Sequence, residues 1–104
     1  MKRAILINPE DMTITEIKIE TKLSSYYEMI GCELIEFVRM SPTVELIIDE
    51  EGRCREDNKY FMFASYPVPL AGKALIIGGA DEEGNSSECT LTLEEAVRSI
   101  RWVR

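Results

Sequence analysis

The chain has 104 residues, of which 45% are hydrophobic and 30% charged, and its 19 Asp and Glu against 12 Lys and Arg give a net charge of −7. This length is typical of one domain with a single core, and the apolar content excludes a disordered chain. Apolar runs are only four or five residues long, too short to span a bilayer. No apolar stretch of signal-peptide length follows the first residues, so we expect one cytoplasmic domain over residues 1–104.

The cysteines and the absence of histidine remove several chemistries. Cys32, Cys54 and Cys89 are odd in number and contain no CxxC pair, which indicates free thiols in a reducing compartment. A chain without histidine is not expected to build a four-ligand zinc site, a Ser-His-Asp or Cys-His catalytic centre, or a histidine-ligated haem. We therefore predict no metal, no cofactor and no catalytic residue, and thus a non-enzymatic protein.

The negative charge is concentrated in the body of the chain. Residues 4–97 contain all 19 acidic residues and only 7 of the basic ones, a net of −12. A body this acidic repels a phosphate backbone, so we expect no direct binding to DNA or RNA, and a basic protein surface becomes a more plausible partner. Solubility alone is the simpler interpretation of the same charge.

The pattern of apolar residues predicts about five strands and two or three helices. The predicted strands are residues 3–8, 12–20, 33–39, 44–49 and 73–77. The predicted helices are residues 22–30, a short helix at 59–65, and a helix that opens at 92–95 and continues through Trp102. The order β-β-α-β-β-(α)-β-α predicts the α+β class: a single two-layer domain in which helices cover one face of a mainly antiparallel sheet.

Local signals in the first half of the chain make two predictions. Ile14 and Ile17 fall on opposite parities of one strand, which predicts a bulge near Thr15–Glu16. Thr21 is expected to cap the first helix, and Gly31 to end it in the left-handed conformation.

Local signals in the second half of the chain make three more predictions. Residues 49–52 predict a hairpin turn with its glycine in the left-handed position. Asn58 is expected to cap the short helix at 59–65. Thr92 followed three residues later by Glu95 is the pattern of a capping box.

The sequence contains two acidic triplets, Asp49, Glu50, Glu51 and Asp81, Glu82, Glu83. Three adjacent carboxylates can hold Mg²⁺ or Ca²⁺, but neither triplet has the alternating Ca²⁺-loop pattern. We therefore interpret both triplets as solvated contact loops.

The thiol of Cys54 is the other candidate for chemistry. Cys54 lies between Arg53 and Arg55, and neighbouring cations lower the pKa of an exposed thiol. Cys54 has no neighbouring base, however, and strand alternation would turn it inward as an inert thiol.

The end of the chain contains the predicted protein interface. On a continuous last helix Trp102 would point away from the apolar stripe, with Arg98 one turn before it. An outward tryptophan beside an arginine is typical of an interface anchor, so we predict Arg98 and Trp102 as interface residues. The alternative is that Trp102 folds back onto the domain at a frayed end.

Several segments spread over the chain form a pattern together: Ala4–Pro9, Ile14–Ile19, Ile30–Gly31, Asp57–Asn58 with Ala64, Leu70–Gly78 and Leu91–Glu95. In these segments the chain resembles a family of small uncharacterised proteins encoded by phages, plasmids and bacteria, a domain of unknown function. The stretch Tyr66–Pro69 departs from the family pattern. The resemblance covers nearly the whole chain and implies a mobile-element or accessory setting, and it transfers no catalytic residue, cofactor or substrate.

The hypothesis these observations favour is a small acidic accessory protein that acts as a non-enzymatic protein-binding or regulatory module. The alternative is an acidic inhibitor, a nucleic-acid mimic that blocks a basic groove on a host nucleic-acid enzyme. A third hypothesis is an enzyme that uses Cys54 or the acidic loops. A protein partner is expected, a homo-oligomer is compatible with the sequence, and no membrane partner is expected.

Overall fold

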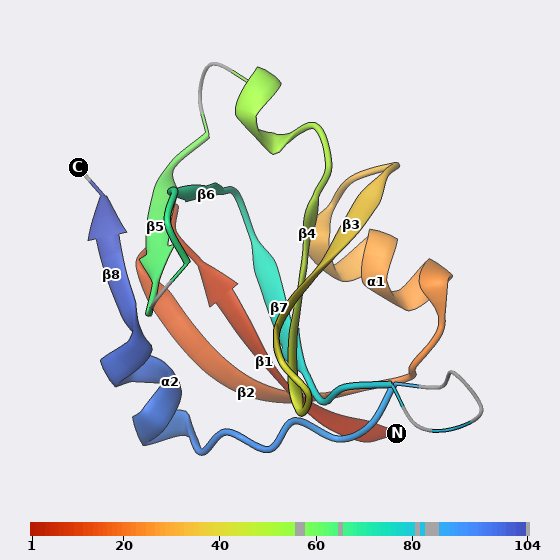
Figure 1. Cartoon of the computed structure of the whole chain (residues 1–104). Helices are drawn as coiled ribbons and strands as arrows, with labels where there is room; N and C mark the ends of the chain where they lie inside the picture. Colours follow the sequence, from red (N-terminus) through yellow and green to blue (C-terminus); the bar gives the residue numbers. More distant parts are fainter. Residues whose placement is uncertain (56–57, 65, 81, 83–85, 104) are drawn as a thin grey trace.

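The computed structural model describes residues 1–55, 58–64, 66–80, 82 and 86–103. Its central element is a five-stranded sheet in which every pair of neighbouring strands is antiparallel (Figure 1). The strand order is β2-β1-β7-β4-β3, so β7 is inserted between the two N-terminal hairpins. The strands are β1 (Lys2–Asn8), β2 (Thr13–Ile19), β3 (Ile35–Ser41), β4 (Val44–Asp49) and β7 (Ala74–Ile77).

A second, three-stranded sheet packs on one face of the first, and helix α1 (Leu23–Ile30) covers the other face (Figure 1). The order of the small sheet is β6-β5-β8, again with antiparallel neighbours. The remaining elements are η1 (Gly52–Cys54), β5 (Tyr60–Phe63), β6 (Leu70–Ala71), α2 (Leu93–Ser99) and β8 (Ile100–Val103). No helix in the described residues is long and apolar enough to cross a membrane.

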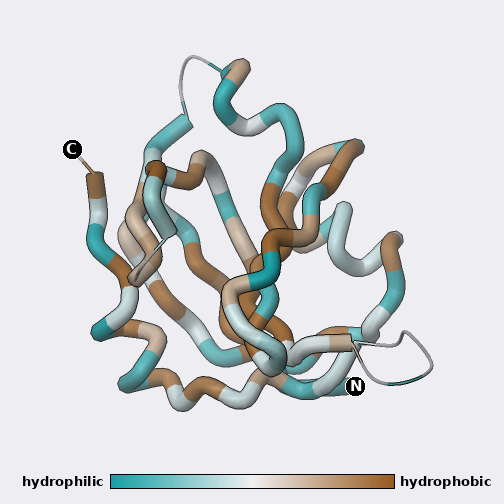
Figure 2. The backbone as a smooth tube through the Cα atoms, viewed as in Figure 1, coloured by the Kyte–Doolittle hydropathy of each residue, from teal (hydrophilic) through white to brown (hydrophobic). Residues whose placement is uncertain are grey.

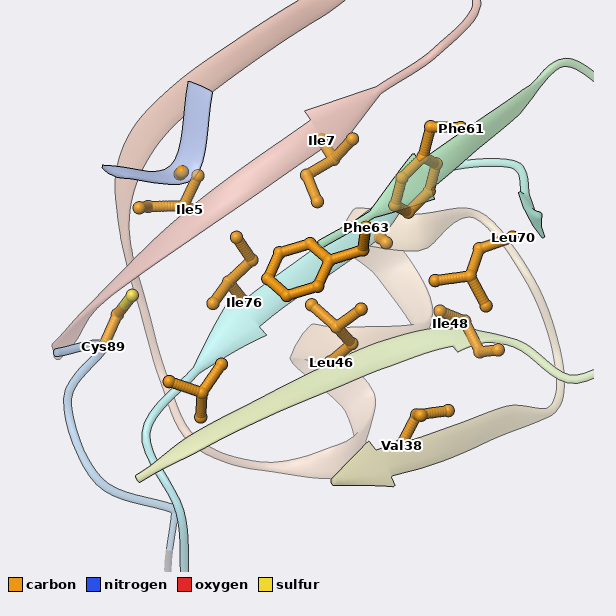
Figure 3. Close-up of a cluster of buried hydrophobic side chains, with 13 residues drawn as sticks. Ile5, Ile7, Val38, Leu46, Ile48, Phe61, Phe63, Leu70, Ile76 and Cys89 are labelled. Carbon is orange, nitrogen blue, oxygen red and sulfur yellow. The ribbon is translucent and has the colours of Figure 1, made fainter. Parts of the chain in front are cut away.

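Buried side chains form two cores on opposite faces of the large sheet. The inner core lies between the two sheets, where Phe61 and Phe63 of β5 face Leu46 and Ile76 of the large sheet (Figure 3). The helix-side core lies under α1 and includes Tyr26. Because β4 and β7 are central strands, their successive residues enter opposite cores, which explains the apolar runs Leu46–Ile48 and Ala74–Ile77. In Figure 2 the brown colour of hydrophobic residues runs along the central strands.

Much of this architecture agrees with the sequence-based expectation. The α+β class and the five-stranded antiparallel sheet are confirmed. Gly31 ends α1 with φ +78°. The capping box is confirmed because the Thr92 side chain accepts from the Glu95 amide and the Glu95 side chain accepts from the Thr92 amide. The second sheet was not predicted, and the two helices contribute to opposite cores rather than covering one face.

The predicted bulge in β2 is wrong. The pairing of β1 with β2 runs without a register shift from Lys2–Ile19 to Asn8–Thr13. The change of parity has another cause: Ile14 packs against the inner core, whereas Ile17 and Ile19 belong to the helix-side core. With apolar layers on both faces of the sheet, no bulge is needed for all three isoleucines to pack against a core.

The predicted short helix at 59–65 is also wrong, because Tyr60–Phe63 forms strand β5. Its alternate residues Phe61 and Phe63 are buried, and the strand is paired on both sides. The last helix is shorter than predicted, because α2 ends at Ser99. Residues Ile100–Val103 form strand β8, which pairs with β5. Each of these two segments is a strand because the other is present to pair with it.

Two turn and cap predictions fail. The glycine of the 49–52 turn, Gly52, begins the 3-10 helix η1 with an ordinary negative φ, and the chain passes on to the second sheet instead of returning beside β4. Gly52 is needed for space, since a Cβ there would lie 2.9 Å from the Ala71 carbonyl oxygen. At the start of α1 the N-cap is Lys22 rather than Thr21, and no side chain caps it.

Candidate binding surface

Two hollows lie next to each other and share Pro9 and Glu10 of the β1–β2 turn and Asn58 and Lys59 before β5. The first, which we call the polar cleft, has a volume of about 250 Å³. The second, the Trp102 groove, has a volume of about 550 Å³. The polar cleft is also lined by Asp49, Arg55, Gly72 and Lys73. The Trp102 groove is also lined by Met12, Tyr60, Trp102 and Val103.

The polar cleft contains an ion pair held by a buried acid. Asp49 ends β4 with its side chain only 8% exposed, and its Oδ2 accepts from Arg55 Nε at 2.9 Å. Its Oδ1 accepts from the Glu51 amide, also at 2.9 Å. The hydrogen bond to Asp49 raises the pKa of the Arg55 guanidinium, which is charged in any case. Both oxygens of the Asp49 carboxylate therefore have partners within the protein, and the ion pair fixes the position of Arg55.

The other wall of the polar cleft is fixed through Asn58. Its side-chain amide donates to the Gly52 carbonyl at 2.7 Å, and the Gly72 amide donates to the Lys59 carbonyl at 2.9 Å. Gly72 has φ +79°, and a Cβ at this position would lie 3.4 Å from the side-chain nitrogen Nδ2 of Asn58. Three separate segments are thus tied together around Lys59.

The Trp102 groove runs beside the last strand. Trp102 and Phe61 are opposite each other in the β5–β8 ladder, and both are directed toward the inner core. Val103 lies opposite Tyr60 in the same ladder. Across the groove Met12 has φ +57°, a left-handed conformation that is rare for methionine, and its side chain is 49% exposed. Apolar side chains therefore line the groove on both sides, together with the polar residues Glu10, Asn58 and Lys59.

The predicted pairing of Arg98 with Trp102 on one helix face is wrong. Because α2 ends at Ser99, Trp102 is on a strand, where it packs against the inner core and lines the groove. Arg98 instead donates to Glu94 at 3.0 Å on the surface of α2. The alternative, in which Trp102 folds back onto the domain, matches the structure. Whether either residue contacts a partner stays a prediction.

The acidic triplets do not behave as units. Asp49 is buried and paired, whereas Glu50, Glu51 and Glu82 are exposed. Asp81 and Glu83 lie outside the described residues. Within the residues that the structure describes, no three Asp, Glu, Cys or His side chains are grouped so as to hold a metal ion.

The thiols also differ from expectation. All three cysteines are free, and Cys54 is exposed rather than turned inward. Its two arginine neighbours are directed elsewhere, since Arg53 donates to the Pro69 carbonyl and Arg55 to Asp49. Cys89 is in the inner core, where burial raises the pKa of its thiol.

Sequence reasoning missed most of the groove and the cleft. Met12, the neighbours Lys59 and Tyr60, and Lys73 come from three separate parts of the sequence and carry no spacing motif. The aromatic residues at 60–63, a type favoured in strands, were the available signal for β5. A four-residue run fits a helix as well as a strand, however, so only the pairing of β5 with β8 resolves it.

Fold and surface together define a small α+β domain with a polar cleft beside an apolar groove. The chain belongs to the family described as the domain of unknown function DUF3846, whose model matches residues 1–99. The family resemblance seen in the sequence is thereby confirmed.

Two relatives show how the chain compares with longer proteins. It is 30% identical over 103 residues to the "Uncharacterized protein y4iR" of Sinorhizobium fredii, which covers 97% of this chain and 63% of that protein. It is 28% identical over 89 residues to "Protein PsiB" of Rhizobium leguminosarum bv. phaseoli, which covers 86% of this chain and 66% of that protein. The chain thus spans about two thirds of the length of these relatives. No solved structure matches it.

Proposed function

We propose that this protein is a non-enzymatic protein-binding module that takes an extended segment of a partner protein along β8, with an apolar side chain of the partner in the Trp102 groove. The observation that carries the proposal is the position of the groove beside an open strand edge. In the described part of the chain, β8 is paired only with β5, and Figure 1 shows it at the border of the molecule. An open edge next to a side-chain pocket is how domains that bind extended peptides combine affinity with specificity.

The hydrogen-bonding pattern supports this edge as a docking strand. The Ala64 amide donates to the Ser99 carbonyl at 2.6 Å, just beyond the last strand pair, Phe63–Ile100. Hydrogen-bonded and non-hydrogen-bonded pairs alternate in an antiparallel ladder. The backbone groups of Ile100 and Trp102 are therefore directed away from β5, where an added strand would find them.

The lining of the groove supports the same proposal. Tryptophan, tyrosine and methionine are the residue types enriched in protein interfaces. Met12 adds an independent argument, because a left-handed conformation costs a non-glycine residue about 1–2 kcal/mol and Asn or Gly would adopt it more easily. A strained residue that presents a half-exposed apolar side chain to a groove is consistent with a binding role.

The wider biological role is part of the proposal. The function of the family is unknown, and the names of the two relatives state no activity. We infer an accessory or regulatory role from the combination of a binding edge with the lack of a complete catalytic group among the described residues.

The test is selection of binding peptides with the full chain as bait, followed by affinity measurements on variants. Met12→Asn removes the apolar side chain while suiting the left-handed backbone, and we expect it to weaken binding about tenfold, as for loss of an interface anchor. Leu23→Asn is the matched control, because Leu23 is 53% exposed on α1, away from the groove. In NMR spectra, the backbone amide signals of Ile100 and Trp102 should change their chemical shifts when a peptide binds.

Three results would count against the proposal. If no peptide is selected, or if Met12→Asn binds as well as the control, the groove is not the binding site. If dimers form through β8 at micromolar concentration, the edge serves a second copy of the chain. A complex that dissociates steeply with salt and is insensitive to Met12→Asn would favour the acidic-inhibitor alternative.

A further inference from the structure

The distribution of basic residues singles out the polar cleft. Residues 4–97 contain only seven Lys and Arg, and three of these, Arg55, Lys59 and Lys73, line this one cleft. They come from the segments before β5 and before β7, so the fold rather than the sequence gathers them. Among the residues that the structure describes, the acidic ones that line it are Glu10 and Asp49. Three cations in one cleft contrast with the net charge of −12 that residues 4–97 carry.

Arg55 is positioned as a binding group. Its Nε atom donates to Asp49, and among the described residues its two Nη atoms make no hydrogen bond. Its side chain is 46% exposed, whereas that of Asp49 is 8% exposed. The buried acid thus fixes the guanidinium plane while its outer donors remain accessible. A fixed guanidinium can bind a carboxylate or phosphate through two parallel hydrogen bonds.

We propose that the polar cleft binds a small oxyanion, a phosphate ester or a carboxylate, through Arg55, Lys59 and Lys73. The volume of about 250 Å³ suits a small molecule. The ligand would meet Arg55 at its Nη groups, with the two lysine ammonium groups balancing the remaining negative charge. This activity is separate from peptide binding along β8 and does not depend on it.

A purely structural explanation has to be separated from this one. The C-terminal end of α1, at Ile30–Gly31, also lines the cleft, and carbonyl groups at a helix C-terminus attract cations. Lys59 and Lys73 would then only neutralise Glu10 and the helix end. In that case anions would not bind, and removing either lysine would change stability alone.

The experiment is an amide NMR titration of the full chain with inorganic phosphate and, separately, with succinate, each at constant ionic strength made up with sodium chloride. We expect saturable shifts at Gly31 and Gly72. Lys73→Ala should weaken binding about tenfold, the usual effect of losing one charge-assisted hydrogen bond. Lys18→Ala, an exposed lysine on β2 outside the cleft, is the matched control.

Each outcome decides the proposal. Tighter binding of phosphate assigns a phosphate ester, and tighter binding of succinate assigns a carboxylate. Shifts that do not saturate, or equal affinities for Lys73→Ala and Lys18→Ala, would overturn it. Arg55→Lys keeps the charge beside Asp49 and loses the paired donors, so a folded variant with unchanged affinity would remove Arg55 from the site. Since Lys73 does not line the Trp102 groove, peptide binding should be unaffected by Lys73→Ala.

Discussion

The two faces of the large sheet are covered very differently. The inner face packs against a second sheet and α2, and the aromatic residues that β5 of the second sheet contributes to this core, Phe61 and Phe63, are 0% and 4% exposed. The other face is covered by the eight-residue helix α1, which leaves Phe37 at the β3 edge 43% exposed. Phe37 still meets Tyr26 of α1 edge to face, with ring centroids 6.1 Å apart.

This difference shows that one short helix is too small to seal a five-stranded sheet, whereas a second sheet with a helix is not. The inner core takes buried residues from every described strand except β2 and β8. Partly buried residues of these two strands, Ile14, Ile100 and Trp102, pack against it. We expect the inner core to dominate the free energy of unfolding, and the helix-side core to contribute less per residue. The predictions that follow test this expectation.

The largest expected effect is at Phe61. Phe61→Ala should lower the free energy of unfolding by about 3–5 kcal/mol, because a fully buried aromatic ring leaves both lost contacts and a cavity. Phe37→Ala is the control, and at a largely exposed site it should cost about 1 kcal/mol or less. Urea unfolding followed by circular dichroism measures both. Equal losses would show that the two faces are equally packed.

Two neighbouring residues of β7 give a sharper comparison. Leu75 and Ile76 are both 0% exposed, but Leu75 belongs to the helix-side core and Ile76 to the inner core. Ile76→Ala should cost about 3–4 kcal/mol and Leu75→Ala about 2–3 kcal/mol, because the side under α1 can relax into the space that is left. Denaturant midpoints at constant m-value give the comparison. The reverse order would contradict it.

One substitution on the helix side should stabilise the protein. The Tyr26 hydroxyl is buried, and no described residue accepts or donates a hydrogen bond to it. Tyr26→Phe removes this unpaired group while keeping the ring against Phe37, and it should raise the free energy of unfolding by about 1 kcal/mol. Thermal unfolding is the measurement. A lower midpoint would mean that the hydroxyl has a hydrogen-bonded partner such as a water molecule.

The smallest expected effect is pH-dependent and belongs to the inner face. The hydrogen bond from the Thr92 amide, followed by that with the Thr92 side chain, lowers the pKa of Glu95 below its ordinary value. The stabilisation is therefore present at neutral pH and is lost as the pH falls through the lowered pKa. Glu95→Gln should be less stable than the parent at neutral pH and differ less in acid. Melting curves at pH 7 and in acid test this, and a constant difference would argue against it.

The elements that the sequence predicted correctly are those with strong local signals. The hairpin β1–β2, the left-handed Gly31 and the capping box Thr92–Glu95 each depend on neighbouring residues. The candidate site was predictable only in part. Trp102 was singled out, but for a position on a helix that ends at Ser99.

By itself, the sequence determined the composition of this protein: one acidic α+β chain, central strands apolar enough for burial on both faces, free thiols and no histidine. The tertiary structure decided where Ile14 and Ile17 point, whether residues 60–63 and 100–103 are helix or strand, and which cations meet in the polar cleft. The physical reason is that short apolar runs satisfy helical and extended periodicities alike. Only pairing with a strand distant in the sequence supplies the hydrogen bonds and the second apolar layer that select one of them.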